Sequence, residues 1–105
     1  MRIYISGQIS NLEKSYYMER FECAELRLTV VDGYSVVNPT KVNAQLPADT
    51  SYEDYMKMSF CMLDMCDAIY MLDGWEESRG ANREYGYAIA KGKKVIFESE
   101  GEAND

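Results

Sequence analysis

Histidine is absent from this chain of 105 residues, and cysteine and proline are scarce, with three and two residues respectively. Without histidine, Ser-His-Asp and Cys-His catalysis and histidine-based metal sites are excluded, so acid–base chemistry must use carboxylates, tyrosine, lysine or cysteine. The odd number of cysteines and their lack of metal-type spacing predict reduced thiols in the core. We therefore expect no bound metal.

Basic residues are also few: 11 lysines and arginines stand against 18 acidic residues, which gives a formal net charge of −7. No basic stripe can displace counterions, so polymeric nucleic acid is not an expected partner, and anionic membranes are disfavoured. The chain shows no signal peptide and no apolar run of spanning length, which predicts a cytoplasmic protein. It has neither a P-loop nor a Gly-x-Gly-x-x-Gly motif, so no nucleotide cofactor is expected.

Short apolar runs alternate with segments of helical spacing. Residues 2–6, 34–37, 68–72 and 95–97 are of strand type, and helices are predicted up to Gly33, from about 52 to 64 and over 79–91. The first helix carries an apolar stripe from Tyr17 to Val31, and 40–50 is expected to be a loop. This order predicts an α/β fold with a compact, flavodoxin-like, doubly wound parallel sheet of four to five strands and helices on both faces. We expect one domain, residues 1–98, and a disordered tail, 99–105.

One carboxylate stands out in the last helix. Glu84 shares its helical stripe with Gly80, Ala81 and Ala88, whose small side chains indicate close packing rather than a solvated face. In parallel sheets ligands bind beyond the carboxyl ends of the strands, near the start of this helix. Glu84 is therefore a candidate catalytic residue, with a plain helical glutamate as the alternative.

Four ordered blocks of sequence carry a family resemblance. They are Ile3–Gly7, Tyr52–Met56, Cys66–Ala68, and the segment from Gly74 to Ala88 with the pattern Ser-x-Gly-x-x-x-Glu-x-Gly. Together they resemble the nucleoside 2-deoxyribosyltransferase-like superfamily, most closely its small DUF4406 branch, which is common in phage and bacterial genomes.

The resemblance implies N-glycosyl transfer or hydrolysis on 2′-deoxyribonucleosides or their 5′-monophosphates, without a cofactor. Glu84 would act as the nucleophile and form a glycosyl-enzyme intermediate. Tyr4 would orient the Glu84 side chain. The implied substrate-binding residues are Gly7, Gln8, Ser59, Asp73, Trp75, Ser78 and Gly80. A small-molecule nucleoside or nucleotide is thus the expected ligand, and the exposed aromatics of so short a chain predict a homo-oligomer, dimeric or larger.

Two departures from the family pattern bear on activity. Relatives usually carry an aspartate at the position of Ser59, and Asp54, Asp73 and Glu77 are possible substitutes. Related monophosphate hydrolases often have an arginine at the position of Ser10, for which Arg79 or Arg83 would have to serve. With no basic residue in 7–10, we expect nucleosides to bind at least as well as monophosphates.

Structural interpretations remain open beside these roles. Tyr4 could be a strand residue only, Trp75 a packing residue, Gly80 a point of close helix–sheet contact, and Ser59 a partner of its own helix. At the level of the whole chain, the alternatives are a catalytically weak or inactive nucleotide-binding module of the same fold, and a structural oligomer without a ligand.

Overall fold

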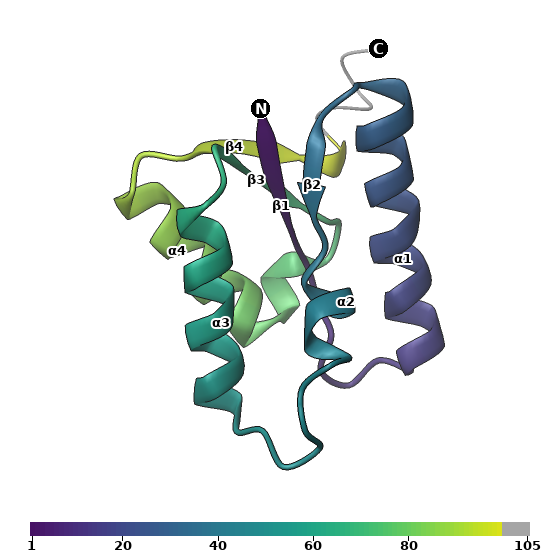
Figure 1. The fold of residues 1–105 in the computed structure, drawn as a ribbon, viewed down its shortest axis with the longest axis vertical. Helices are drawn as coiled ribbons and strands as arrows, with labels where there is room; N and C mark the ends of the chain where they lie inside the picture. The colour runs from purple at the N-terminus through teal and green to yellow at the C-terminus, as the bar shows by residue number, and fades with distance from the viewer. Residues whose placement is uncertain (100–105) are drawn as a thin grey trace.

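In a computed structural model, which describes residues 1–99, the chain folds into a four-stranded parallel sheet with helices on both faces (Figure 1). The strands are β1 (Arg2–Ser6), β2 (Ser35–Val37), β3 (Ala68–Met71) and β4 (Lys94–Phe97). The helices are α1 (Lys14–Leu26), the π-helical η1 (Arg27–Val31), α2 (Pro39–Asn43), α3 (Tyr52–Asp64), the 3₁₀ turn η2 (Trp75–Glu77) and α4 (Arg79–Ala90). Among residues 1–99, no helix is long and apolar enough to cross a bilayer.

The strands lie in the order β2-β1-β3-β4, and every neighbouring pair is parallel. Ile3 of β1 pairs with Val36 of β2 on one side and with Ala68 of β3 on the other. The chain thus starts near the middle of the sheet, runs to one edge and returns across β1 to the other edge. This is the doubly wound, flavodoxin-like order, so the predicted fold class is confirmed, with four strands.

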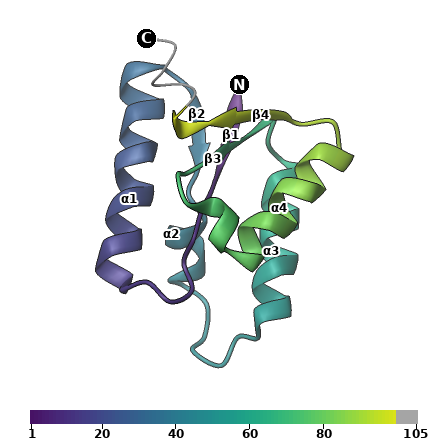
Figure 2. The same ribbon diagram turned by 180° about the vertical axis from the view of Figure 1, so that it is seen from behind.

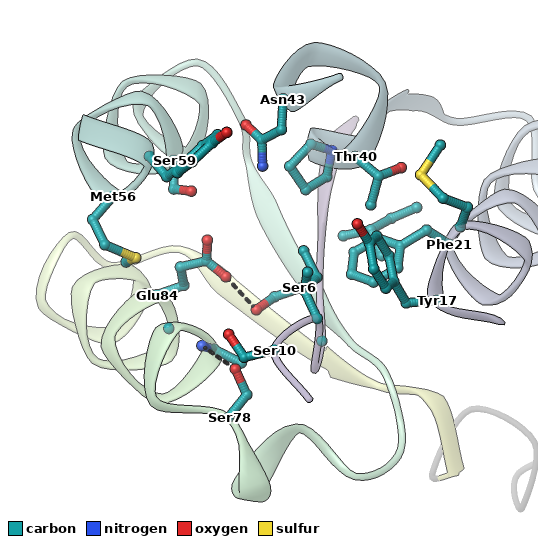
Figure 3. A pocket seen from close by; sticks show the side chains of 18 of the residues that line it. Ser6, Ser10, Tyr17, Phe21, Thr40, Asn43, Met56, Ser59, Ser78 and Glu84 are labelled. Atoms are coloured by element: carbon teal, nitrogen blue, oxygen red, sulfur yellow. Dashed lines mark hydrogen bonds between the residues drawn. The ribbon is translucent and has the colours of Figure 1, made fainter. Parts of the chain in front are cut away.

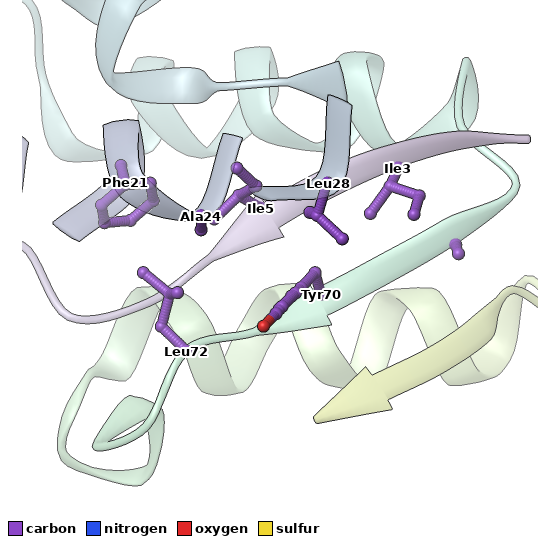
Figure 4. Close-up of a cluster of buried hydrophobic side chains, with 8 residues drawn as sticks. Ile3, Ile5, Phe21, Ala24, Leu28, Tyr70 and Leu72 are labelled. Atoms are coloured by element: carbon purple, nitrogen blue, oxygen red, sulfur yellow. The ribbon is translucent and has the colours of Figure 1, made fainter. Parts of the chain in front are cut away.

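The alternation of side chains along β1 divides the core into two parts. Ile3 and Ile5 point to the face covered by α1, where Phe21 and Leu28 pack against them (Figure 4). Tyr4 lies in the opposite cluster, with side chains of α3 and α4. The two views of the ribbon place α1 on one side of the sheet and α3 and α4 on the other (Figures 1 and 2). Residues two apart on β1 therefore face the same helices.

Signals at helix ends behave as their chemistry predicts. The Ser51 side chain accepts a hydrogen bond from the backbone N–H of Asp54 at 3.1 Å, which caps α3. Gly92 follows α4 with a φ of +72°, a conformation that residues with a Cβ rarely adopt. The predicted helix of 79–91 and the predicted strand of 95–97 agree with α4 and β4 to within one residue.

Three details of the prediction are wrong. The expected loop of 40–50 contains most of α2, because Asn38 caps that helix and Pro39 occupies its first turn. Val31 is 75% exposed rather than part of the core stripe, because the helix has turned to π geometry before it. All three cysteines are free thiols, as predicted, but only Cys66 is buried, whereas Cys23 and Cys61 are exposed.

The predicted tail begins at residue 99. Ser99 is described, and its hydroxyl donates a hydrogen bond to the Asp73 carboxylate. The prediction of disorder for 100–105 falls on residues outside the described part of the chain.

Candidate active site

A pocket of about 530 Å³ opens at the carboxyl end of β1 (Figure 3). Its walls come from the loop after β1 and from α1, α2, α3 and the first half of α4. This is the edge of a parallel sheet at which ligands bind, and the volume is within the usual range for small-molecule sites.

Glu84 projects into this pocket from α4. The helix begins at Ser78, whose side chain accepts a hydrogen bond from the backbone N–H of Ala81 at 3.1 Å. Ala81 and Ala88 are almost fully buried, so α4 packs closely at the stripe that carries Glu84. The glutamate is therefore only 8% exposed. The small-residue stripe correctly indicated a buried carboxylate.

Two hydroxyls of β1 hold this carboxylate. The Tyr4 hydroxyl donates to Glu84 Oε2 at 2.7 Å, and the Ser6 hydroxyl donates to Oε1 at 2.6 Å (Figure 3 shows the second bond). Tyr4 and Ser6 are two apart on one strand, so both point toward α4. Each carboxylate oxygen is fixed by one donor and keeps further acceptor capacity for a group in the pocket.

Burial raises the pKa of the Glu84 carboxyl above its ordinary value. Hydrogen bonding by Ser6, Tyr4 and Ser59 lowers this pKa, but it does not offset the loss of hydration. No cation contributes to the pKa shift. Glu84 is thus a buried carboxyl with hydroxyl donors and without a charged partner among residues 1–99, and its raised pKa makes it more basic than a solvated glutamate.

Tyr4 is itself completely buried. Burial, and then the nearby charge of Glu84, raise the pKa of the Tyr4 hydroxyl well above its ordinary value. The phenol therefore stays protonated at all physiological pH values and remains a hydrogen-bond donor to Glu84.

Four of the other predicted site residues line the pocket: Gly7, Ser59, Ser78 and Gly80. Ser59, on α3, is 5% exposed and directs its hydroxyl toward the carboxylate of Glu84 (Figure 3). Gly7 has a steric reason to be glycine, because a Cβ there would lie 2.9 Å from the Cδ1 atom of Leu72. At Gly80 a Cβ would make only an ordinary contact of 3.6 Å with Met56.

The structure places the remaining three, Gln8, Asp73 and Trp75, outside the lining of the pocket. The Gln8 side chain donates to the carbonyl of Ser10 at 3.3 Å, within its own loop. The Asp73 backbone N–H donates to Glu98 at 2.9 Å, so this end of β3 is tied to residues after β4.

The Trp75 side chain packs against other aromatic rings and does not line the pocket. Its ring lies 4.9 Å from that of Tyr85 and 6.2 Å from that of Phe97, measured between centroids. These contacts place Trp75 in the packing between η2, α4 and β4. The packing alternative thus describes Trp75 better than base stacking does.

Several lining residues were not among the predicted ones. Ser6 could have been found, because it follows Tyr4 by two residues on a strand. Asn43 lines the pocket only because α2 forms where a loop was expected. Lys14, at the start of α1, supplies a basic group to the pocket. The sequence prediction considered only residues 7–10 for this purpose and therefore did not include it.

The two arginines considered for a phosphate are engaged elsewhere. The Arg79 guanidinium lies over the Tyr52 ring, 4.9 Å from its centroid. Arg83 forms a salt bridge to Glu53 at 3.1 Å. Neither lines the pocket, whereas Tyr52 does.

Glu84 is the single carboxylate among the lining residues that the structure describes. Asp54, Asp73 and Glu77, the proposed substitutes for an aspartate at Ser59, do not contribute to the wall. Over residues 1–99 no group of three or more acidic or cysteine side chains is arranged to hold a metal ion. The arrangement offers one nucleophile or base, hydroxyl donors around it, and no second carboxylic acid.

Comparison with known proteins identifies the family and the fold. The family described as "Domain of unknown function (DUF4406)" matches residues 1–97. The chain belongs to this family. No curated protein matches the sequence. Among solved structures, the CMP N-glycosidase BcmB of Clostridium botulinum resembles this DUF4406 domain with a TM-score of 0.62 and 26% identity, over 92% of this chain and 67% of the other. The resemblance inferred from the four sequence blocks is confirmed at the level of family and fold.

Proposed function

We propose that this DUF4406 protein cleaves or transfers the N-glycosidic bond of a nucleoside or nucleoside 5′-monophosphate. The observation that carries the proposal is the buried Glu84 carboxylate, held by Tyr4 and Ser6 at the wall of a pocket of small-molecule size. The likeness to a CMP N-glycosidase at 26% identity supports the same class of reaction.

In the proposed mechanism Glu84 attacks the anomeric carbon of the sugar. A C–O bond forms between the carboxylate and C1′ while the C1′–N bond breaks, and the base leaves with the bonding electron pair and takes up a proton. Water, or a second base, then displaces the carboxylate from C1′, which releases the sugar or a new nucleoside. The transition state resembles an oxocarbenium cation, and a preplaced carboxylate stabilises such a cation electrostatically.

The surrounding groups have separate tasks in this mechanism. Tyr4 and Ser6 orient Glu84 and fix its two oxygens. Ser59 supplies a hydroxyl to the sugar, and Ser78 and Gly80 border the sugar and its 5′ group. These steps use side chains of the chain alone, so the proposal requires neither a metal nor a cofactor.

Lys14 bears on the form of the substrate. It lines the pocket together with Ser10, and it would give a 5′-phosphate a cationic partner despite the net charge of −7. This argues against our expectation that nucleosides bind as well as monophosphates. We therefore propose the 5′-monophosphate as the preferred form.

The test is incubation of the purified protein with ribo- and deoxyribonucleosides and their 5′-monophosphates, with release of free base followed by chromatography. Free base alone identifies a hydrolase, and a new nucleoside formed with an added second base identifies a transferase. The Glu84→Gln protein serves as the control. Release of base at equal rates by the native protein and by this variant would contradict the proposal.

One observation favours a second candidate, a nucleotide-binding module without turnover. Among the described residues, the pocket lining holds no carboxylic acid besides Glu84, and Ser59 occupies the position at which the family resemblance implies an aspartate. A leaving base would then lack a strong proton donor. Tight nucleotide binding by the native protein, with no base released from any substrate, would establish this alternative.

A further inference from the structure

The side chain of Asn43 has unused hydrogen-bonding capacity in the pocket. Its Oδ1 atom is buried and has no hydrogen-bond partner among residues 1–99. In this part of the chain, every other buried side-chain nitrogen or oxygen has a hydrogen-bond partner. Asn43 also lines the pocket, as the last residue of α2. A buried acceptor that has lost water and gained no partner is unfavourable, and such groups in native proteins call for a specific explanation.

The position of Asn43 relative to Glu84 suggests which part of a ligand it meets. Figure 3 shows the Asn43 amide across the cavity from Glu84, with its nitrogen directed inward. Ser10 and Ser78 lie on the other side of Glu84 in the same view. A nucleotide with its anomeric carbon at Glu84 would therefore extend its sugar and 5′ group toward the serines, and its base toward α2.

Part of the wall near Asn43 is apolar or already engaged in hydrogen bonds. Phe21 and Pro39 are apolar. The Thr40 hydroxyl, which is polar, already donates to Asn38 Oδ1 at 2.6 Å. Tyr17 also lines this part of the wall and carries a hydroxyl (Figure 3), but the amide of Asn43 offers a donor and an acceptor side by side. Rotation of the amide by 180° exchanges the two without changing its shape.

We propose that Asn43 is the base-recognition residue of the pocket. It binds the edge of a nucleobase that presents an N–H donor next to an acceptor, as the hydrogen-bonding edges of cytosine, adenine, guanine and thymine all do. In the orientation shown in Figure 3 the amide nitrogen faces the base, and rotation of the amide brings Oδ1, which lacks a partner in the folded chain, to the same place. This inference rests on the proposed function for the placement of the sugar at Glu84.

The test compares Asn43→Leu with Gln45→Leu. Leucine approximates the shape of asparagine and removes its polar atoms, and Gln45 is an exposed amide two residues further along, outside the pocket. Both changes are made in a Glu84→Gln background, which holds the substrate intact. The ligands are the 5′-monophosphates of deoxycytidine, deoxyadenosine, deoxyguanosine and thymidine, with 2-deoxyribose 5-phosphate as the ligand without a base.

Calorimetry should give the following pattern. Asn43→Leu weakens binding of the best-bound nucleotide by about tenfold to a hundredfold, the effect of one or two lost hydrogen bonds. It leaves the affinity for 2-deoxyribose 5-phosphate within about twofold, and it does not lower the melting temperature, because the unpaired oxygen is gone. Gln45→Leu changes none of these values.

Other outcomes overturn the assignment in distinguishable ways. Equal loss for the nucleotide and the sugar phosphate, or a lowered melting temperature, would show that Asn43 is structural, and no loss would show that it does not touch the base. When Asn43→Leu is made alone, with Glu84 retained, base release that is insensitive to the substitution would leave the proposed function standing without this inference. The expected binding pattern without base release by the native protein would leave Asn43 as the base reader and remove the proposed reaction. Failure to bind any of these ligands would overturn both.

Discussion

Replacement of Glu84 by glutamine removes a negative charge and keeps the size of the side chain. If Glu84 is the nucleophile, turnover should fall by roughly a thousandfold or more, since the amide can neither bond to the anomeric carbon nor stabilise an oxocarbenium ion. Substrate binding should survive, because Tyr4, Ser6 and the rest of the pocket are unchanged.

The effect on folding has the opposite sign to the effect on rate. A hydroxyl that donates to a carboxylate contributes about 1.5–3 kcal/mol, against about 0.5–1.5 kcal/mol for a neutral acceptor, so the two bonds from Tyr4 and Ser6 lose roughly 2–3 kcal/mol together. The substitution also removes the desolvation of a buried ion, which costs several kcal/mol. The raised pKa of Glu84 shows that desolvation is the larger effect. Glu84→Gln should therefore be neutral or more stable by up to about 2 kcal/mol, where 1 kcal/mol corresponds to about 4–8 °C in Tm.

The stability difference should depend on pH in a defined direction. Because the pKa of Glu84 is raised by folding, the folded protein binds more protons than the unfolded chain between the ordinary pKa and the raised one. Stability contributed by this group is thus highest at low pH, falls as pH rises through that window, and is constant above it. The advantage of Glu84→Gln should be full above the raised pKa and shrink toward pH 4.5, the ordinary value for glutamate.

The measurements are base release under saturating substrate and thermal unfolding from pH 4.5 to 8. Glu77→Gln is the matched control, because Glu77 is exposed, lies outside the pocket and removes the same charge. A Glu84→Gln protein that keeps most of its turnover would refute the covalent role. One that is less stable than native by more than about 1 kcal/mol at pH 8, while Glu77→Gln is not, would refute the balance of desolvation and hydrogen bonding worked out above.

Three further changes test other residues that line the pocket. Tyr4→Phe removes one donor to the carboxylate, so the acidic limb of the kcat/KM profile should move to higher pH and kcat should fall about tenfold to a hundredfold, as seen by base release across pH; an unmoved limb would contradict the role of the hydroxyl. Lys14→Met should raise KM for a 5′-monophosphate at low salt and leave the corresponding nucleoside unchanged, and equal effects on both would exclude Lys14 as a phosphate ligand. Ser59→Asp should raise kcat for poor leaving groups, since general acid assistance is typically worth about 10²–10⁴-fold, at some loss of stability; a folded variant that accelerates no substrate would place the acid elsewhere.

The fold could be predicted from the sequence because each of its elements carries a local signal. Alternation on β1, the Ser51 cap and the glycine after α4 depend on residues within one turn or strand. Glu84 could be predicted for the same reason, since its stripe of small neighbours lies on one helix. The parallel sheet then brings the end of β1 to this helix.

The opposite wall of the pocket could not be predicted in this way. α2 has five residues and begins with a proline, so its apolar periodicity is too short to recognise, and the sequence predicted a loop at Asn43. The directions of Asp73 and Trp75 depend on contacts with Glu98 and Phe97, which lie more than twenty residues further along. Sequence order placed these two residues at the correct edge of the sheet, and only tertiary packing decided that they face away from the pocket.

The pocket joins two groups that the folded chain leaves incomplete. Glu84 is a carboxyl group in a desolvated place, and its charged form is stabilised only in part by hydroxyls and by no cation among residues 1–99. Across the cavity, Asn43 keeps a buried oxygen without a partner. Folding alone favours a neutral side chain at the first position and an apolar one at the second, so neither residue is explained by stability. A ligand that develops positive charge at one end and carries a hydrogen-bonding edge at the other satisfies both, and a nucleoside at the transition state of glycosidic cleavage has this distribution.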